Sequence, residues 1–369
     1  MKKVLLAGVA APALLVATAA SAQEAPPVPT IGGNLDLSIS GNARFSVIGG
    51  DDDRDRTDRS RGYVFKSDES EVRFNAKATA DNGIGYGLSV EIQTQTNDES
   101  NADETWVFLD SDGFGRVELG DQDGAADRMF VDAADVMKGR GGFDGPTGDY
   151  VDFGSGVSGP SFGQTSDATK AIYFTPRFSG FQAGGSFTPD TGHSGSAGEV
   201  DNDGTFKNVV SLGANYQQSF EDVSVTVAAG GQFGEAEPPG AGVTPGQDLE
   251  VWGVGANVSF AGFTVGAGYT DLNETGEPAL TTGDAGSWWD LAASYTSGPW
   301  GVAVGTFNSE RDIGAVDTEV SIYSLTGSYT VAPGLALAAD INFIDVDNLN
   351  TAGDDNDGVS WVISLTASF

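Results

Sequence analysis

The sequence has no cysteine and a single histidine among its 369 residues. Without cysteine the chain can form no disulfide bond, no thiolate nucleophile and no zinc–thiolate site. Basic residues are also scarce, because 18 lysines and arginines stand against 53 acids, which gives a formal net charge of −35. Nucleic-acid binding by the whole domain is therefore not expected, since it needs a surplus of bases to neutralise phosphates.

Long apolar runs are missing except at the N-terminus. There Lys2 and Lys3 precede an apolar stretch from Val4 to Ala20, and the small residues Ala20-Ser21-Ala22 follow. This pattern predicts a secretory signal peptide over residues 1–22, and residues 23–34, rich in proline and glycine, read as a short lead-in. No later apolar run reaches about 18 residues, so a helical membrane bundle is excluded.

From residue 35 onward apolar and polar residues alternate with a period of two. At the start of this region Leu35, Leu37 and Ile39 alternate with Asp36 and Ser38, and comparable segments recur up to the C-terminus. Successive side chains of a strand point to opposite faces, so each segment predicts a strand with one apolar and one polar face.

The connections between these strands alternate between short and long. Short turns are expected near 81–83, 111–114, 178–180, 219–222, 260–262, 297–299 and 331–334, and long loops near 49–69, 96–103, 121–169, 188–206, 235–248, 271–287, 308–318 and 345–357. Seven short turns and eight long loops join sixteen strands. Tight turns at one rim and longer loops at the other are typical of a closed antiparallel barrel in an outer membrane.

The distribution of charge and of aromatic residues decides between this barrel and a soluble β-sandwich. The apolar strand faces carry no charged residue, although one Arg or Lys at mid-membrane on a lipid-facing strand would cost about 2–4 kcal/mol. Aromatic residues gather near the strand ends, as in the two interfacial belts of membrane barrels: near the short turns Tyr86, Phe263, Tyr295, Trp300 and Tyr329, and nearer the loops Tyr269, Trp289, Tyr323, Phe343 and Trp361. A secreted calcium-binding β-roll is the main rival, but its glycine-rich nonapeptide repeat is absent. We therefore predict an all-β fold, a 16-stranded antiparallel transmembrane β-barrel over residues 35–369.

Four stretches of the chain carry a resemblance to a known family: the last strand with its C-terminal Phe369, residues 112–120, residues 172–181 and the long segment 121–169. Phe369 is similar to the assembly signal of outer-membrane barrels, and residues 112–120 and 172–181 resemble the segments that flank the third loop of trimeric porins. The chain thus resembles a Gram-negative general porin, and residues 120–124 look most like porins of the alphaproteobacterial type. The long segment 121–169 lies between those two stretches, and the resemblance covers essentially the whole mature chain. It implies a homotrimer in which each protomer has its own pore and the third loop folds inward to narrow the lumen.

Within the expected constriction loop, Phe130, Ala133, Ala134 and Met137 have the spacing of one face of a short helix. By the resemblance, this helix would pack Phe130 and Met137 against the inner wall.

The loop also offers acids that could form one side of the pore constriction. The acidic side is predicted to consist of Asp127, Asp132, Asp135 and Asp144, and the basic side of Arg44, Arg73, Lys77 and Arg116, which fall on polar strand faces or beside the loop. Acids facing bases would set up a transverse field at the narrowest point. Alternatively, Asp127 and Asp132 only solvate or cap the loop helix. The surplus of acids suggests a preference for cations.

Two runs of acids in the outer loops, residues 51–53 and 354–357, could bind Ca²⁺ or bridge divalent ions to lipopolysaccharide, or could be no more than solvated loops. The single His193 stands beside Ser194 in a glycine-rich outer loop, which gives no catalytic geometry, so no enzyme activity and no cofactor are expected.

The function expected from the sequence is passive diffusion of ions and small hydrophilic solutes through a water-filled channel in the outer membrane. A sixteen-stranded barrel is wide enough to leave such a channel. Two alternatives are a channel selective for a sugar or another small solute, which an aromatic ladder in the lumen would favour, and a structural or surface-interaction barrel. The expected partners are outer-membrane lipid, lipopolysaccharide and further copies of the chain.

Overall fold

The computed structural model describes residues 35–54, 61–93, 102–160, 162, 164–195, 204–240, 245–276, 283–312, 316–349 and 351–369, with the side chain of Glu69 left out. The predicted signal peptide, residues 1–22, and the lead-in, residues 23–34, lie outside the described residues. No helix in the described part of the chain is long and apolar enough to cross a membrane.

Sixteen strands form one closed antiparallel barrel in which neighbours in the sequence are neighbours in the sheet and β16 pairs with β1. The strands are β1 (Asp36–Asp52), β2 (Tyr63–Thr79), β3 (Gly85–Gln93), β4 (Ala102–Ser111), β5 (Gly115–Asp121), β6 (Thr169–Phe174), β7 (Phe181–Asp190), β8 (Phe206–Phe220), β9 (Val223–Ala236), β10 (Leu249–Phe260), β11 (Phe263–Asp271), β12 (Asp284–Ser297), β13 (Trp300–Asp312), β14 (Asp317–Ala332), β15 (Leu335–Asp347) and β16 (Asn356–Ser368). The expected fold class and strand number are confirmed, and closure leaves the barrel without first and last edge strands.

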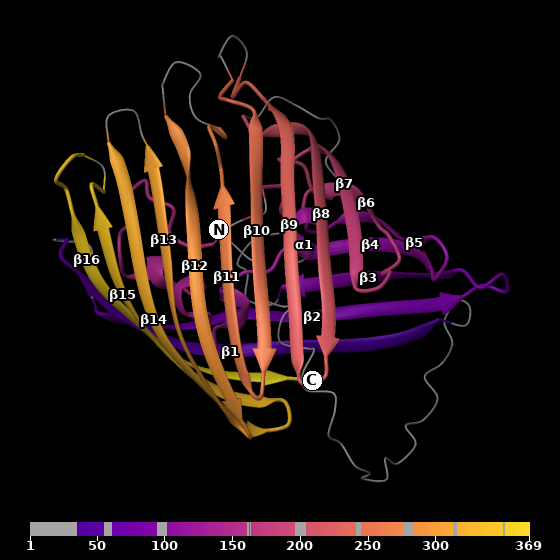
Figure 1. Cartoon of the computed structure of the whole chain (residues 1–369), viewed down its shortest axis with the longest axis horizontal. Coiled ribbons are helices and arrows are strands. Elements are labelled where there is room, and N and C mark those ends of the chain that lie inside the picture. The colour runs from indigo at the N-terminus through magenta and orange to yellow at the C-terminus, as the bar shows by residue number, and fades with distance from the viewer. Residues whose placement is uncertain are drawn as a thin grey trace.

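All seven short connections that the sequence predicts are tight turns between consecutive strands. The turn from β10 to β11 consists of Ala261 and Gly262, and both have positive φ angles, 50° and 87°. Positive φ at both central residues matches the right-handed twist of a hairpin and explains a glycine there. The strands thus run between a rim of tight turns and a rim of longer loops, which for β8–β15 lie at the bottom and at the top of Figure 1.

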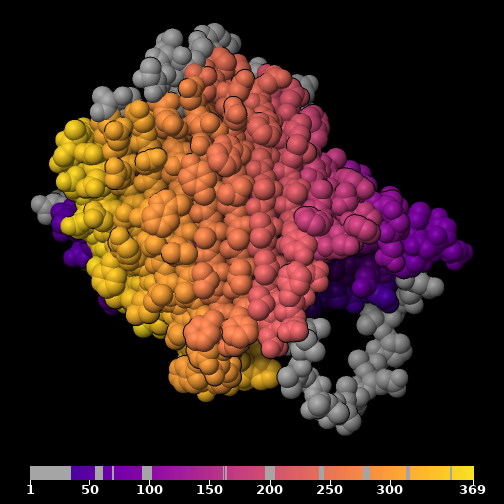
Figure 2. Space-filling view, in the orientation of Figure 1, coloured from indigo at the N-terminus to yellow at the C-terminus, as the bar shows by residue number. Residues whose placement is uncertain are grey.

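The apolar faces of the strands form the outside of the barrel. Trp300 and Tyr329 lie side by side near the tight turns with ring centroids 4.4 Å apart, and Phe263 and Tyr295 are 4.5 Å apart at the same rim. Nearer the loops, Trp252 and Tyr269 form a similar pair at 5.5 Å. The outer wall over β8–β15 is a continuous surface in Figure 2, as a lipid-facing wall requires.

The long connection between β5 and β6, residues 122–168, lies inside the barrel. It contains the helix α1 (Ala125–Met129) and the short 3₁₀ turns η1 (Ala134–Val136), η2 (Gly142–Asp144) and η3 (Thr147–Asp149). The helix α1 contacts β6–β9, η1 contacts β11 and β12, and η2 contacts β13–β15. The prediction of an inward-folded third loop is confirmed, and α1 lies within the barrel in Figure 1.

The predicted single helix through Phe130 and Met137 is wrong in its extent. The chain leaves the α-helix at Phe130, which is extended, and only a 3₁₀ turn follows at Ala134–Val136. The segment follows the curved inner wall, because Phe130 contacts Trp288 of β12 and Met137 lies against Gly305 of β13. The expected packing itself is confirmed, since Met137 is buried in the cluster below the loop and Phe130 packs against that cluster.

Large apolar side chains line part of the inner face of the barrel where the loop covers it. Trp288 of β12, Phe307 of β13 and Ile322 of β14 point inward and are fully buried under the loop. A second apolar cluster, around Phe162 and Val251, lies below the end of the loop. Burial of these side chains fastens the loop, because each fully buried large apolar side chain contributes roughly 1.5–3 kcal/mol.

Candidate channel constriction

The first turn of the constriction loop is held by hydroxyl groups of the barrel wall. The N–H of Ala125 donates to the Oγ of Ser186 on β7 at 3.1 Å, and the N–H of Ala126 donates to the Oγ of Ser211 on β8 at 3.0 Å. These are two of the N–H groups that a helix N-terminus leaves without a partner of its own. At the other end of α1, Asn215 of β8 donates to the carbonyl of Met129 at 3.2 Å.

The middle of the loop is held in the same way by wall residues farther round the barrel. The carboxylate of Asp290 on β12 accepts the N–H of Ala133 at 3.2 Å, and Thr326 on β14 accepts the N–H of Lys138 at 3.0 Å. The sequence analysis did not identify Asp290 as a residue that holds the loop. The available signal was a polar side chain at an inward-facing strand position, on the wall of a barrel that contains a long loop. This signal does not identify the loop residue to which the side chain bonds.

Two ion pairs join the loop to β2. Arg140 and Asp68 form a pair at 3.1 Å in which both side chains are nearly buried, with relative exposures of 9% and 8%. Ser46 of β1 donates a further hydrogen bond to Asp68 at 3.0 Å. Farther along the loop, Asp149 pairs with Lys66 of β2 at 3.0 Å on an exposed surface.

The four predicted acids of the constriction all lie on the inward loop, at different depths. Asp127 is half-buried in α1, and Asp135 is exposed and accepts a hydrogen bond from Asn257 at 3.3 Å. Asp132 accepts the backbone N–H of Ala134 at 2.9 Å, and the N-cap residue of η1 is Ala133. Asp144 is the last residue of η2. Asp135 presents its carboxylate to solvent, and the roles of the four acids, in the constriction or as caps, stay predictions.

Burial and neighbouring carboxylates raise the pKa of several loop acids. Burial, reinforced by the charges of Asp290 and Asp135, raises the pKa of Asp132 well above its ordinary value. Burial also lowers the pKa of Lys138, the loop's own lysine. The charge of the constriction therefore depends on pH.

The predicted basic residues line the opposite wall, and acids of that wall accompany two of them. Arg73 pairs with Glu91 and, at 3.1 Å, with Glu104. Arg44 on β1 donates to the hydroxyl of Thr366 at 3.2 Å, and Lys77 is exposed on β2.

Arg116 on β5, the last of the predicted bases, is also paired within its own wall. It forms ion pairs with Asp110, at 3.0 Å, and with Glu118. The wall of β1–β5 is therefore a mixture of bases and acids, not a uniform basic band.

The two ends of the loop meet at Lys170 of β6. Its buried ammonium donates to the carbonyl of Gln122 at the start of the loop and to the carbonyls of Ser166 and Ala168 at the end, the last two at 2.6 and 2.5 Å. One side chain thereby ties the start of the loop to its end.

Acids surround this junction. Carboxylate oxygens of Glu104, Asp123 and Asp167 lie within 4.8 Å of one another. Burial and the nearby charges of Asp127 and Asp167 raise the pKa of Asp123 to about 8, and burial with the charges of Asp103 and Glu104 raises that of Asp167 to about 7. The two loop acids at the junction therefore titrate near neutral pH.

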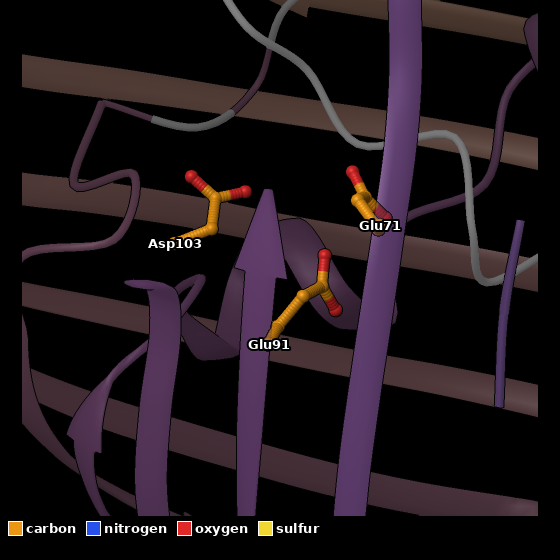
Figure 3. Close-up of side chains that lie close together, drawn as sticks. All are labelled: Glu71, Glu91 and Asp103. Atoms are coloured by element: carbon orange, nitrogen blue, oxygen red, sulfur yellow. The ribbon is translucent and has the colours of Figure 1, made fainter. Parts of the chain in front are cut away.

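A second group of acids gathers on the same wall at the loop-side end of β2–β4. Figure 3 shows the carboxylates of Glu71, Glu91 and Asp103 directed toward a common space, and their oxygens lie within 4.8 Å of one another. Arg73 neutralises part of this charge through its pair with Glu91. The wall therefore carries more acid than base at this level.

The remaining sequence candidates lie at the rims. Asp354 pairs with Arg54 at 2.8 Å, and Asp52 accepts the N–H of Asp152 at 3.1 Å, so acids of both outer runs bind partners within the protein. The carbonyl of His193 accepts the N–H of Thr169 at 2.9 Å. Calcium binding by the outer runs stays a prediction.

Phe369 closes the barrel at the rim of tight turns. Its backbone N–H and carbonyl both bond to Gly41 of β1, at 3.0 and 3.1 Å. This contact extends the pairing of β16 with β1 to the last residue of the chain. Its role as an assembly signal stays a prediction.

Comparison with known proteins places this barrel in a family. The family model of the Gram-negative porins matches residues 8–349. A porin of Rhodobacter capsulatus is 25% identical over 336 residues, which cover 86% of this chain and 98% of that porin.

Two solved structures share the fold. The anion-selective porin of Comamonas acidovorans superposes with a TM-score of 0.65 at 16% identity, covering 91% of this chain and all of that one. OmpT of Vibrio cholerae, in its trimer form, gives a TM-score of 0.62 at 14% identity, covering 91% of this chain and 99% of that one. Because the family model matches most of a chain that folds as a closed sixteen-stranded barrel with an inward loop, the protein belongs to the Gram-negative porins and is a non-enzymatic channel of the outer membrane.

Proposed function

We propose that this porin passes ions and small hydrophilic solutes by diffusion, prefers cations, and is narrowest between loop 122–168 and the wall of β2–β5. The observation that carries the proposal is the fastening of the loop to the inner wall from β6 round to β15. The helical turns of the loop pack on that part of the wall, and the ion pairs of Arg140 and Asp149 join the loop to the first part of β2. The rest of the side of β2–β5 then bounds the water path. Such a loop reduces the lumen of a wide barrel without plugging it.

The charges of the two sides support a preference for cations. Arg73 and Arg116 are each paired with two acids of their own wall. On the loop side, Asp127 and Asp135 form no ion pair with a base among the described residues. These two acids place negative charge on the loop side of the water path, and negative side chains lining a pore favour cations.

Planar-bilayer recordings of the purified, refolded protein would test this proposal. Stepwise conductance in KCl is expected, with a reversal potential in a KCl gradient of the sign that marks cation preference. Replacing Asp127, Asp135 and Asp144 by asparagine should move that potential toward anions. The matched control is Asp112→Asn in the turn between β4 and β5, which should leave it unchanged.

Silence from a folded barrel would contradict the diffusion function and favour a structural or surface-interaction role. A reversal potential that the triple variant does not move would place the selectivity elsewhere in the lumen.

We further propose that the chain works as a homotrimer and that residues 1–22 are removed on export. The trimer form of the Vibrio cholerae protein and the shared fold support the first part, and closure of conductance in three equal steps would test it. Mass spectrometry of the N-terminus of protein isolated from membranes would test cleavage after Ala22. Lipopolysaccharide contact through divalent ions at the acidic outer loops is proposed on the charge of those loops alone, and chelator-dependent release of lipopolysaccharide would test it.

A further inference from the structure

Two large aromatic side chains face the lumen on the side that the helical turns of the loop leave open. On β4, Val107 and Leu109 point to the lipid, with relative exposures of 52% and 51%. Trp106 and Phe108 occupy the alternate positions of the strand, so their side chains point inward. The loop's helical turns contact β6–β9 and β11–β15, so burial under those turns does not account for the two rings. Apolar rings beside a water path therefore need another explanation.

Glycines of the neighbouring strands lie against both residues. A Cβ atom on Gly87 of β3 would lie 2.7 Å from the ring of Phe108, so this ring lies in the space that the missing side chain leaves. A Cβ atom on Gly120 of β5 would lie 2.6 Å from the Cα of Trp106, so the two strands approach closely there. The two ring centroids are 5.8 Å apart and the ring planes are tilted by 53°. We call Trp106 and Phe108 the aromatic shelf.

The guanidinium group of Arg116 lies over the rings of the shelf. The Cζ of Arg116 lies 3.8 Å from the ring centroid of Phe108 and 5.3 Å from that of Trp106. Arg116 is held by Asp110 at 3.0 Å and by Glu118. The side chains of Arg116 and Asp110 remain 30% and 40% exposed, so the shelf has an accessible polar edge with both donors and acceptors.

A second stack of the same kind adjoins the first. Glu118, which is fully buried, also pairs with Arg128 of the loop, and Arg128 lies 4.8 Å from the ring centroid of Phe174 on β6. The two guanidinium groups and the two carboxylates, Asp110 and Glu118, cancel in charge. A charged solute therefore finds no uncompensated partner within this group.

We propose that the aromatic shelf is a subsite for a neutral, polyhydroxylated ring, that is a sugar, during passage through the channel. One face of a sugar ring presents C–H bonds, which complement the negative face of an aromatic ring, and its hydroxyls match mixed donors and acceptors at the edge. Sites for small molecules combine apolar and aromatic lining with a few placed polar groups in the same way. The inference rests on the diffusion function proposed above and adds a solute class to it.

The test compares D-glucose with sorbitol, an acyclic polyol of nearly the same size, in bilayer current-noise recordings on the refolded protein in KCl. Glucose is expected to add noise that saturates with concentration, and sorbitol is not. Trp106→Leu should weaken glucose binding about tenfold, as the loss of one aromatic contact predicts, while Trp106→Phe retains most of it. The matched control is Trp289→Leu on the outer face of β12, which should bind glucose as the native protein does.

KCl conductance and heat-modifiable migration on gels serve as the folding check for each variant. Equal behaviour of glucose and sorbitol, or undiminished glucose binding by a folded Trp106→Leu variant, would overturn the subsite while the KCl channel stands. Binding of guanidinium in place of glucose would also overturn it, in favour of a cation site. Absence of KCl conductance in the folded native protein would instead overturn the diffusion function.

Discussion

Arg140 of the constriction loop and Asp68 of β2 form a nearly buried ion pair, at 3.1 Å, between residues 72 positions apart in the chain. The N–H of Arg140 donates at the same time to the carboxylate of Asp340 on β15, at 2.7 Å. One residue thus connects the loop to two parts of the wall that lie on either side of the β1–β16 junction. The bonds of Arg140 to Asp68 and to Asp340 hold the middle of the loop against this part of the barrel wall.

Replacing Arg140 by alanine should therefore release the middle of the loop. Removal of one partner leaves Asp68 buried without its counter-ion, which costs about 3–5 kcal/mol. We expect frequent conductance fluctuations in single-channel recordings and faster cleavage of the loop by added protease. The control is Lys66→Ala, which breaks the exposed pair with Asp149 and should cost about 0–1 kcal/mol. Equal behaviour of the two variants would show that the buried pair does not hold the loop.

Cation preference should increase as pH rises from about 6 to about 9. The pKa of Asp167 is raised to about 7 and that of Asp123 to about 8, so both are largely neutral below that range and ionised above it. Two negative charges then appear at the junction of the loop ends. Reversal potentials in a KCl gradient, recorded across this range, measure the effect, and the double variant Asp123→Asn, Asp167→Asn should lose it.

The same raised pKa values predict that stability decreases with pH. The folded chain holds protons on Asp123 and Asp167 that the unfolded chain releases near pH 4, so the folded state binds more protons between about pH 4 and pH 8. The free energy of unfolding then falls as pH rises through that range. The stabilisation that comes from the raised pKa values of Asp123 and Asp167 is fully present only at the acidic end of the range. Urea titrations read out by gel mobility, at pH values across the range, would reveal an opposite slope if the assignment were wrong.

A methyl group at Gly255 of β10 should displace the loop without changing any charge. A Cβ atom there would lie 1.7 Å from the carbonyl oxygen of Val131, so Gly255→Ala forces the loop away from the wall. Overpacking of this kind costs typically 1–3 kcal/mol. The control is Gly327→Ala on β14, where a Cβ atom finds only an ordinary contact at 3.7 Å. Altered conductance in the first variant alone is the expected result.

An arginine on the lipid face should destabilise the barrel, and one on the open lumen wall should not. Leu291 lies on the outer face of β12 between Trp289 and Tyr295, and Leu291→Arg should cost about 2–4 kcal/mol. Asn75 of β2 pairs with Ser89 on the lumen side, so Asn75→Arg should fold normally and shift the reversal potential toward anions. Refolding yield in lipid vesicles measures the first effect, and equal yields would contradict the assignment of faces.

The sequence by itself determines the strands, the rims and the faces of this barrel. A period of two forces side chains such as Leu291 and Asp290 to opposite faces, and a two-residue turn such as Ala261-Gly262 forces neighbouring strands to be antiparallel. These are local relations between residues close in the chain, so pattern alone resolves them. The position of the inward loop follows from its length and its place between β5 and β6.

Only the tertiary structure decides what the lumen contains. The inward Trp288 and Phe307 break the polar pattern of the inner face because the loop covers them, and the apolar spacing from Phe130 to Met137 follows the curved wall instead of one helix. The pair of Arg140 with Asp68 and the shelf of Trp106 under Arg116 depend on which wall residues closure brings opposite the loop. Such contacts join residues from different strands, and their distances are fixed by the curvature and register of the whole closed sheet, which no local pattern encodes.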